Sequence, residues 1–294
     1  MRELGRLGLG TAPLGGLYDA VADETAHAVV ARAWEHGVRY FDTAPYYGSG
    51  LAEERLGAAL RGQPRDDYVV STKVGRLLRP GTSEWPGGPA LEAYFDFSHD
   101  ATLRSLEESL GRLGLDRVDV ALVHDPDDHY EQARDETLPA LARLREEGVV
   151  GAVGVGMNQS KLLCRFAREA DVDCFLLAGR YTILDRSGAD ELLPLCAERG
   201  IAVVAGGVFN SGVLAGGNTY DYAPASADVL ERVAQLRGTC ARWDVPLQAA
   251  AVQFPLRHPA VVTVLVGCRT PEEVDEDVQL VGLELPQGLW AELA

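Results

Sequence analysis

The chain has 294 residues, of which 47% are hydrophobic and 24% charged, and this composition is typical of a globular protein with a large core and not of a disordered chain. Its formal net charge of −17 argues against a nucleic acid as partner, because such binding needs a basic stripe on the surface. The length permits one large domain such as a (β/α) barrel, which typically needs about 250 residues.

Two features bear on the cellular compartment. The first residues, MRELGRLGLG, lack the apolar core of a signal peptide, and no run approaches the roughly 20 apolar residues of a membrane span. A cytoplasmic location is therefore expected. The five cysteines form no C-x-x-C pair and lie mostly inside apolar runs, which predicts reduced thiols in the core and no redox or metal role.

Residues 7–16, LGLGTAPLGG, begin as a short strand and continue into a glycine-rich turn. Gly8 and Gly10 match the first two glycines of the dinucleotide fingerprint G-x-G-x-x-G, but Pro13 occupies the third position and no helix pattern opens there. The sequence therefore predicts no Rossmann site. Residues 23–36 then carry apolar side chains at helical spacing and stop before a glycine, which predicts the first helix.

Residues 39–48, RYFDTAPYYG, place one acid and two tyrosines directly after an apolar, β-prone run. Pro45 and Gly48 end that run, so Asp42 and Tyr47 are expected where a strand stops. In a barrel of alternating strands and helices, the carboxyl end of a strand is where the chemistry takes place. The rest of the chain is organised around this stretch.

A helix over residues 51–60 leads to a strand over 68–75, YVVSTKVG, which contains Lys73. A lysine in such a run is expected to be paired or functional, because an unpaired buried ammonium is costly; the alternative is a snorkelling lysine on an edge strand. Residues 76–97 mix prolines and glycines with aromatics and predict a long functional loop. Trp85 and Tyr94 are suited to stacking on a sugar or ring, or alternatively to packing the loop down.

A helix capped by Ser98 or Asp100 precedes a strand over 118–123 that ends at His124. The cluster HDPDDH, in which His124 and His129 flank three acids, has no metal-site spacing that we recognise, so no metal is predicted. Strands and helices alternate from there onward. The remaining expected helices cover 136–147, 160–170, 189–199, 227–243, 246–256 and 271–281, and the remaining expected strands cover 151–157, 174–178, 201–207 and 261–267.

Eight strands, each followed by helical sequence, predict a (β/α)8 TIM barrel that forms a single domain over residues 1–294. No linker-like segment and no longer repeat interrupt the alternation. Neither a coiled-coil heptad nor an apolar surface stripe is visible, so the sequence predicts no oligomeric state.

Four polar residues lie at or near the ends of consecutive strands, in the contexts DTAPYYG, STKVG and LVHDPD: Asp42, Tyr47, Lys73 and His124. Their order resembles the catalytic tetrad of the aldo-keto reductases, and the resemblance covers essentially the whole chain. A phenol ionises near pH 10, so Tyr47 needs a nearby cation to exchange a proton at neutral pH, and Lys73 held by Asp42 is expected to supply it. The resemblance implies that His124 orients the substrate oxygen and that Tyr46 lines the pocket.

The same resemblance implies a nicotinamide cofactor. Family members hold its amide with a Ser-Asn pair and a Gln and stack an aromatic on its ring; here Met157-Asn158 replaces the pair, Ala178 stands near the Gln position, and Gly206 or Gly207 near the aromatic. Asn158 is therefore the expected contact. The segment GGVFNSGVL is expected to wrap the pyrophosphate, or else to be an ordinary glycine-rich loop. The predicted contacts in it are Phe209, Asn210, Ser211, Gly212 and Leu214.

Residues 266–277, VGCRTPEEVDED, correspond to the region that contacts the adenosine 2′ group. Arg269 is one cation there, whereas Glu273 stands where a second is expected. A carboxylate repels a 2′-phosphate and accepts a hydrogen bond from a free ribose hydroxyl, so the predicted cofactor is NAD, and Arg269 keeps NADP as the alternative. The predicted contacts in this region are Gly267, Arg269, Glu273 and Asp277.

The runs LVHDPDD, GVGMNQ, LAGRYTILDR and AGGVFNSG resemble the branch that contains L-fucose, L-galactose and D-threo-aldose 1-dehydrogenases and a pyridoxal 4-dehydrogenase. That resemblance implies oxidation of a sugar hemiacetal at C1 to the lactone, with Tyr47 as general base. The alternatives are pyridoxal oxidation, NADPH-dependent reduction of aldehydes or ketones, and a non-catalytic nucleotide-sensing subunit. The expected pocket walls are Tyr46, Trp85, Tyr94 and Arg180. The particular substrate and the direction of reaction are not predicted.

Overall fold

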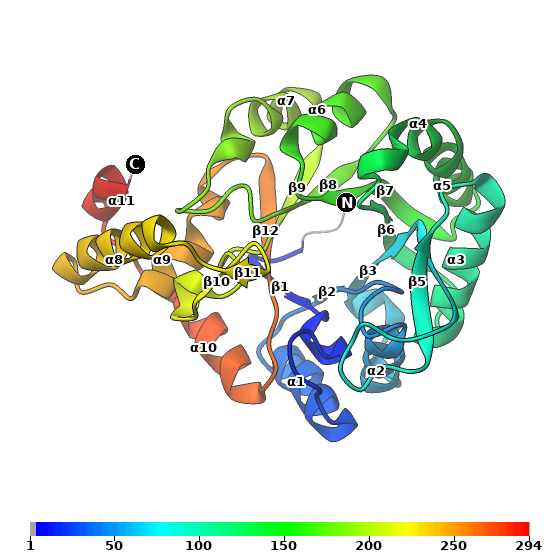
Figure 1. The fold of residues 1–294 in the computed structure, drawn as a ribbon, viewed down its shortest axis with the longest axis horizontal. Coiled ribbons are helices and arrows are strands. Elements are labelled where there is room, and N and C mark those ends of the chain that lie inside the picture. The colour runs from blue at the N-terminus through cyan, green and yellow to red at the C-terminus, as the bar shows by residue number, and fades with distance from the viewer. Residues whose placement is uncertain (1–3, 294) are drawn as a thin grey trace.

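The computed structural model describes residues 4–293, and at its centre eight parallel strands close into a barrel surrounded by helices (Figure 1). Strand β12 pairs with β1 and so closes the ring. The predicted (β/α)8 barrel is confirmed. In chain order the barrel strands are β1 (Leu7–Gly10), β2 (Tyr40–Asp42), β3 (Val69–Val74), β6 (Val118–His124), β7 (Val150–Met157), β8 (Cys174–Ala178), β9 (Ala202–Gly206) and β12 (Val261–Val266).

Each predicted helix is present, with ends that differ by a few residues. The helix expected over 189–199 begins at Leu192, after a 3-10 turn, and the one expected over 136–147 follows the short α4 (Tyr130–Gln132) and a π-helical stretch, Ala133–Thr137. The main helices are α1 (Asp23–Glu35), α2 (Leu51–Leu60), α3 (His99–Leu113), α5 (Leu138–Glu146), α6 (Ser160–Glu169), α7 (Leu192–Arg199), α8 (Ala227–Arg242), α9 (Leu247–Gln253) and α10 (Pro271–Gly282). The sequence did not predict α11 (Gln287–Leu293).

Strand periodicity decides which side chains enter the barrel. Successive side chains of a strand point to opposite faces. Tyr40 belongs to the cluster inside the barrel, whereas Phe41 packs in the layer between strands and helices, so Asp42 returns to the inside. In β3 the same alternation directs Val69 to the inside, and also the second and fourth residues after it. The last of these is Lys73. Barrel closure therefore collects polar side chains from separate strands at one end of the interior.

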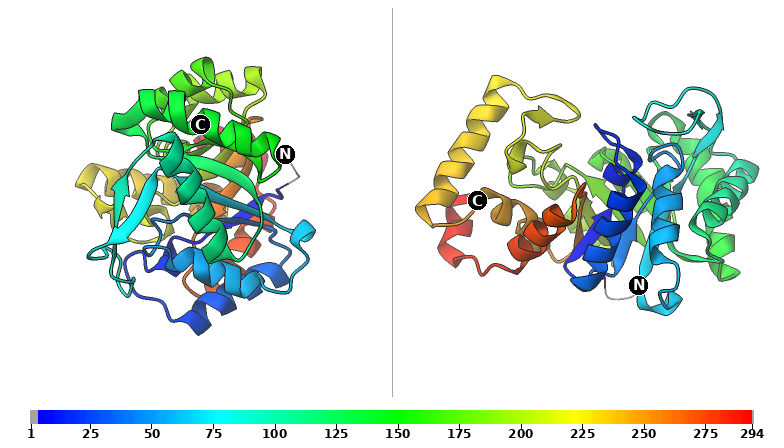
Figure 2. Two further views of the ribbon diagram at one scale, coloured as in Figure 1. Left: turned by 90° about the vertical axis from the view of Figure 1, so that its right-hand side faces the viewer. Right: turned by 90° about the horizontal axis from the view of Figure 1, so that it is seen from below.

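Two hairpins extend the barrel at the same end (Figure 2, right). Strands β4 (Arg76–Pro80) and β5 (Leu91–Phe95) pair antiparallel, and the two-residue strands β10 (Thr219–Tyr220) and β11 (Ala223–Pro224) form a smaller hairpin. The sequence predicted an irregular loop over 76–97. The glycines and prolines that suggested it lie mostly between β4 and β5 and form the connection, while the flanking runs pair.

Two further features of the described residues concern the cysteines and the helices. All five cysteines lie within the described part of the chain, and each is buried and free. Burial raises the pKa of the Cys174 thiol and the Cys196 thiol to about 12, which keeps both protonated. Within residues 4–293, no helix combines the length and the apolar character needed to cross a membrane.

Helices α2 and α3 are joined to the barrel through one buried carboxylate. Glu53 on α2 is fully buried, accepts a hydrogen bond of 2.5 Å from the Thr72 hydroxyl of β3, and pairs with the Arg112 guanidinium of α3 at 2.7 Å. A buried carboxylate is tolerated only when it is paired and hydrogen-bonded, and here both conditions are met. Glu53 thereby fixes two helices against the strand that carries Lys73.

Glu53→Ala is expected to lower the free energy of unfolding by about 3–5 kcal/mol, because it leaves the largely buried Arg112 charge with only the more distant Glu108 carboxylate, at 3.9 Å. Urea denaturation followed by far-UV circular dichroism measures this change. The matched control is Glu147→Ala, which removes a pair with Arg143 whose side chains are 49% and 71% exposed. That control should change the free energy by less than about 0.5 kcal/mol, and equal losses in both variants would contradict the assigned role.

Candidate active site

A buried ion pair lies at the carboxyl ends of β2 and β3. The Lys73 Nζ is 2.6 Å from the Asp42 Oδ2 and also donates to the Thr43 carbonyl at 2.9 Å. The other carboxylate oxygen of Asp42 accepts a 2.6 Å hydrogen bond from the Ser71 hydroxyl, which in turn lies 2.9 Å from the Tyr40 hydroxyl. Lys73 is 1% exposed and Asp42 is 3% exposed. The pair is therefore held rigidly and out of bulk water.

The environment keeps the Lys73 ammonium charged. Burial alone lowers the pKa of Lys73, but the adjacent Asp42 carboxylate and the Tyr47 phenol raise it by more, so the net shift is upward. A fixed positive charge is thus present at the mouth over the whole physiological pH range. The sequence argument that a lysine in this strand must be paired agrees with this geometry.

Tyr47 lies beside that charge. The Lys73 Nζ is 4.5 Å from the centre of the Tyr47 ring. The turn that carries the ring is pressed against the loop after β1, since a Cβ added to Gly15 would lie 2.6 Å from the Gly48 nitrogen. Gly48 also has a left-handed φ of 66°. Two glycines therefore allow the close approach that places Tyr47.

The pKa of the Tyr47 phenol is raised in this structure. Burial is the largest cause, Lys73 opposes it, and Asp42 adds to it. The cation thus offsets only part of the burial effect. The phenol is protonated at neutral pH in the protein alone.

His124 faces Tyr47 from β6. The two rings meet edge to face, with centroids 5.8 Å apart and an interplanar angle of 88°. Burial, followed by the charges of Arg76 and Lys73, holds the pKa of His124 well below its usual value. The imidazole is therefore neutral, which suits a hydrogen-bond donor to an oxygen and not a cation. The structure brings together all four predicted catalytic residues.

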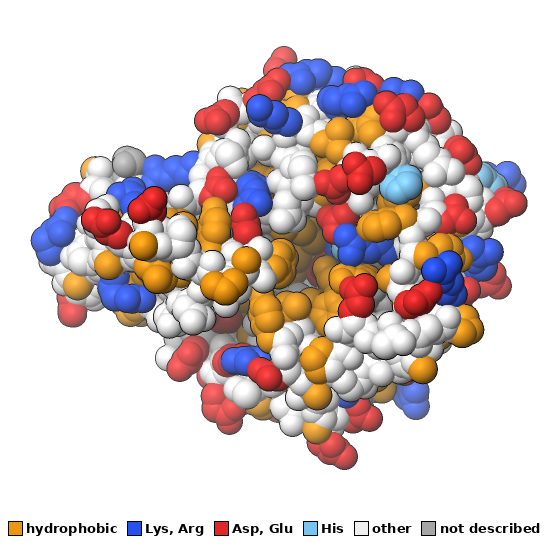
Figure 3. Space-filling view, viewed as in Figure 1, with side chains coloured by type: hydrophobic (Ala, Val, Ile, Leu, Met, Phe, Trp, Pro, Cys, Tyr) orange, Lys and Arg blue, Asp and Glu red, His pale blue; other side chains and the backbone are white. Residues whose placement is uncertain are grey.

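Tyr46 and Trp85 border the same mouth. Their rings are 5.1 Å apart and edge to face, and Trp85 is also 6.0 Å from the Tyr47 ring. The Tyr46 hydroxyl donates to the Glu84 carboxylate at 3.0 Å. The β4–β5 hairpin connection thus brings an aromatic wall to the tetrad. Figure 3 shows this face hollowed at its centre, with hydrophobic side chains around the hollow and charged ones at its rim.

Two of the residues expected to form pocket walls are engaged elsewhere. Tyr94 accepts a 3.0 Å hydrogen bond from Arg104 of α3, which places it beside that helix and not against the tetrad rings. Arg180, after β8, makes a double hydrogen bond to the Asp221 carboxylate at 2.8 and 2.9 Å and lies 3.5 Å from Asp185. These pairings raise the pKa of Arg180. Arg180 therefore fastens the β10–β11 hairpin to the barrel.

The floor of the mouth has few side chains. Asn158, after β7, is half-buried, and within residues 4–293 its amide has no hydrogen-bond partner. Gly156 lies next to the lysine, since a Cβ there would be 3.7 Å from the Lys73 Cε, and Gly206 ends β9 without a side chain. A free amide beside an open floor fits the carboxamide and the flat ring of a nicotinamide. Met157 is buried and belongs to the core, as its apolar side chain suggests.

The segment after β9 is already a compact set of turns. The amides of Asn210, Gly212 and Leu214 donate to carbonyls of the same segment, and the Asn210 side chain donates to the Gly179 carbonyl at 3.1 Å. Leu214 is fully buried, whereas Phe209 is half-buried and packs on the core. These three amides were predicted to bind a pyrophosphate, but in this structure they form hydrogen bonds within the loop itself.

Two neighbouring positions in this segment are partly exposed to solvent. Ser211 and Gly212 are partly exposed, with left-handed φ values of 58° and 97°. The Ser211 hydroxyl accepts a hydrogen bond from the Tyr222 amide at 3.1 Å and so connects the loop to the β10–β11 hairpin. Of the predicted contacts in the segment, Ser211, Gly212 and Phe209 are partly exposed, and Phe209 packs on the core.

Arg269 lies between two carboxylates at the end of β12. Its amide donates to Glu273 at 2.6 Å, and its guanidinium lies 3.4 Å from both Glu273 and Asp19. The Thr270 hydroxyl caps α10 by accepting from the Glu273 amide at 3.3 Å. Gly267 is packed so closely that a Cβ there would lie 2.7 Å from Pro13. The cation predicted for this region is thus surrounded by negative charge.

Asp277 lies apart from that cluster. It is buried beneath α10, where its carboxylate accepts a 3.4 Å hydrogen bond from the Cys268 thiol. Burial raises the pKa of Asp277 to about 7. The sequence placed this side chain beside an adenosine ribose. The helix turns it inward instead, because it follows Val274 by three residues and shares its buried face.

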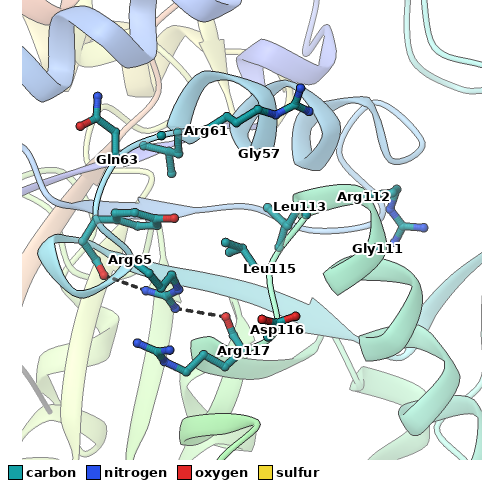
Figure 4. A pocket seen from close by; sticks show the side chains of 14 residues that line it. Gly57, Arg61, Gln63, Arg65, Gly111, Arg112, Leu113, Leu115, Asp116 and Arg117 are labelled. Carbon is teal, nitrogen blue, oxygen red and sulfur yellow. Dashed lines mark hydrogen bonds between the residues drawn. The ribbon is translucent and has the colours of Figure 1, made fainter.

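A cavity of about 400 Å³ opens at the other end of the barrel, between the ends of α2 and α3 (Figure 4). Three of the arginines that line it are in ion pairs: Arg65 with Asp119 at 2.6 Å, Arg112 with Glu53 at 2.7 Å and Arg117 with Asp66 at 2.5 Å. The helix carboxyl ends add negative partial charge. None of the tetrad residues lines this cavity, which is not part of the candidate site.

Sequence reasoning missed two charged residues beside the tetrad. Arg76 was read only as the start of a loop, and Asp125 only as part of a metal candidate. The structure pairs them at 2.5 Å next to His124. His129 instead packs on Phe97 with ring centroids 5.1 Å apart, and among the described residues no group of His, Cys, Asp and Glu is placed to hold a metal ion. The sequence did contain one signal for Asp125, since it is a charged residue that directly follows His124 at the end of a strand.

Comparison with known proteins agrees with this geometry. A family model described as "Aldo/keto reductase family" matches residues 6–294. The chain is 44% identical to a D-threo-aldose 1-dehydrogenase of Pseudomonas sp over 98% of its own length and 92% of the relative. It is 41% identical to a pyridoxal 4-dehydrogenase of Microbacterium luteolum over 99% and 96%. An aldo-keto reductase structure from Bacillus halodurans, in its holo form, superimposes with a TM-score of 0.79 at 26% identity, covering 98% of this chain and 92% of that one.

Arg180→Met is expected to speed amide hydrogen exchange in residues 216–224 about fivefold, because a partly exposed pair of this kind contributes about 1 kcal/mol to holding the hairpin closed. Hydrogen–deuterium exchange with mass spectrometry measures the rate. Arg168→Met is the control, since it removes an exposed pair with Glu191 on the outer helices. If exchange in the hairpin is the same in both variants, the Arg180–Asp221 pair does not fasten it.

Proposed function

The chain belongs to the aldo/keto reductase family, and from this premise we propose that it oxidises a sugar hemiacetal at C1 to the lactone. It is an oxidoreductase that acts on CH–OH groups of small molecules with a nicotinamide cofactor. The observation that carries the proposal is the group of side chains at the mouth: the Lys73–Asp42 pair, the Tyr47 ring 4.5 Å from the ammonium, and the neutral imidazole of His124.

Each side chain of the tetrad has one role in the proposed reaction. Tyr47 takes the proton from the anomeric hydroxyl as the C1–O bond becomes a carbonyl. Lys73, kept charged by Asp42, stabilises the phenolate that Tyr47 must become in order to act as a base. His124 donates a hydrogen bond to the substrate oxygen and orients it. Asn158, Ser211 and Gly212 would hold the nicotinamide cofactor, which would supply the acceptor for the hydride that leaves C1.

The expected cofactor contacts divide into two groups. Asn158 is free to bind the carboxamide, and Ser211 and Gly212 lie accessible on the loop after β9. The side chains of Leu214 and Asp277 are buried, so neither is assigned a contact in this proposal. We assign NAD as the preferred cofactor because Glu273 flanks Arg269 and repels a 2′-phosphate, with NADP as the alternative.

The relatives support the substrate class. The name of the 44% identical relative specifies oxidation of an aldose at C1, and that of the 41% identical relative specifies oxidation of pyridoxal. Both names describe dehydrogenases. The aromatic wall made by Tyr46 and Trp85 suits either a sugar face or a pyridine ring.

A second candidate function rests on the raised pKa of Tyr47. A phenol that stays protonated at neutral pH is ready to act as an acid, which is the role it takes in the reduction of an aldehyde or ketone. Oxidation should then accelerate with rising pH, as the phenol loses its proton, and reduction should slow. Rates in both directions across pH, with NAD and NADP, decide which direction the site favours near neutrality.

Tyr47→Phe is expected to lower kcat for oxidation of L-fucose or D-threo-aldoses with NAD⁺ by at least about 100-fold, since a positioned proton acceptor contributes 10²–10⁴ in rate. Steady-state nicotinamide absorbance gives the rates. The control Tyr68→Phe removes a hydroxyl directly before β3, at the other end of the barrel, and should leave kcat unchanged. Unchanged turnover in Tyr47→Phe, with the loss found in Tyr46→Phe, would reassign the base.

Glu273→Gln is expected to raise the ratio of kcat/KM with NADP⁺ to kcat/KM with NAD⁺ about tenfold, which corresponds to about 1.4 kcal/mol. The change removes a negative charge beside Arg269 and frees its guanidinium for a phosphate. Glu272→Gln makes the same change one residue away, on an exposed position, and should alter the ratio little. A ratio that moves equally in both variants would exclude a local role for Glu273.

A further inference from the structure

Two charged residues outside the tetrad lie beside the His124 ring. Arg76 begins β4 and Asp125 directly follows β6, and the Arg76 Nη2 is 2.5 Å from the Asp125 Oδ2. That same oxygen is 3.8 Å from the His124 Nε2, which is too long for a hydrogen bond. Arg76 therefore binds the one carboxylate oxygen that lies nearest the imidazole.

Both members of this pair are held in place. The Arg76 guanidinium carbon lies 4.5 Å from the centre of the Tyr46 ring and 4.9 Å from that of Phe95, and its side chain is 18% exposed. Asp125 has a left-handed φ of 45°, and its amide donates to the Gly156 carbonyl at 3.0 Å. The backbone hydrogen bond anchors Asp125, and the two rings hold the guanidinium, so both members of the pair are supported by their neighbours.

The surroundings of His124 favour a single proton on the ring. Its Nδ1 is buried and has no hydrogen-bond partner among the described residues, so a second proton there would be left without an acceptor. The neutral ring then carries its proton on Nε2, the atom nearest Asp125. The charged and titratable side chains that face the imidazole are Lys73 from β3, Arg76 from β4, Asp125 on its own segment, and Tyr46 and Tyr47 from the turn after β2.

We propose that Arg76 is a positioning residue that, by binding Asp125, keeps His124 neutral and its Nε2–H free for the substrate oxygen. This inference rests on the proposed role of His124 as a hydrogen-bond donor to the substrate. Without Arg76, the Asp125 carboxylate is free to accept the hydrogen bond from the Nε2–H itself. The Nε2–H is then no longer available to the substrate oxygen, and the carboxylate stabilises the imidazolium. Arg76 prevents both by competing for that oxygen with a shorter, charge-assisted hydrogen bond.

The direction of the pKa shift agrees with this geometry. Burial is the first cause that lowers the pKa of His124, and the Arg76 and Lys73 charges are the next two. The Lys73 charge, paired with Asp42, stays in place when Arg76 is changed. Removing Arg76 takes away one of these two positive charges and leaves the Asp125 carboxylate, 3.8 Å from the ring, without its partner, and both changes raise the pKa of His124.

The test is an NMR titration of the full-length protein with carbon-13 labelled histidine, in which His124→Gln assigns the resonance. In the wild type the His124 signal should not titrate between about pH 5 and 8. In Arg76→Gln a titration midpoint should appear inside that window. Arg76→Met, which keeps an apolar stem against the Tyr46 and Phe95 rings, gives the same readout if the Gln variant does not fold.

Three further variants decide whether the effect runs through Asp125. Asp125→Asn and the double variant Arg76→Gln/Asp125→Asn should not titrate in the window, because the carboxylate is gone, and Arg76→Lys should restore the wild-type behaviour. A silent His124 signal in Arg76→Gln, or an equal midpoint in the double variant, would overturn the proposal. The NMR signals are measured without substrate. A protein that does not oxidise sugars would therefore overturn the proposed function, whereas the effect of Arg76 on His124 is tested by the titration alone.

Discussion

The Lys73–Asp42 pair is the constraint on which the rest of the site depends. An ammonium and a carboxylate that are 1% and 3% exposed lose nearly all their hydration, and their attraction compensates only with good geometry and further hydrogen bonds. The Ser71 hydroxyl and the Thr43 carbonyl supply these bonds. Because this charge is fixed, it acts on both groups around it: the Lys73 ammonium lowers the pKa of the Tyr47 phenol and that of the His124 imidazole.

The barrel achieves this arrangement with little special structure. Period-two alternation along separate strands directs three polar side chains inward, and the common direction of the strands gathers them at one end. Tyr47 is the exception, since it lies on a turn and depends on the close contact between Gly15 and Gly48. The strands therefore fix the electrostatics, whereas backbone packing between two loops fixes the position of the proposed proton acceptor.

The sequence predicted the features that strand periodicity sets, but not those that depend on packing between distant segments. The eight strands, the main helices and the inward direction of Asp42 and Lys73 come from local periodicity, which a single sequence displays. The directions of Arg180 and Tyr94 do not, because they depend on hairpins and helices distant in the chain: Arg180 meets Asp221 across 41 residues. The contact predicted for Asp277 came from the resemblance of residues 266–277 to a family region, which does not show that the helical face buries this side chain against Cys268.

The two hairpins at the mouth have an evolutionary consequence. Both are inserted between elements of the barrel, and each is attached to it by few side-chain bonds, such as the Arg180–Asp221 pair and the hydrogen bonds of Ser49 to Ser83 and to the Leu91 carbonyl. Exchange of either hairpin between homologues leaves the inner strands untouched. Selection and directed evolution can therefore change the molecules admitted to the mouth through the hairpin connections, while the barrel strands stay constant and Arg76, at the base of the β4–β5 hairpin, keeps its pair with Asp125.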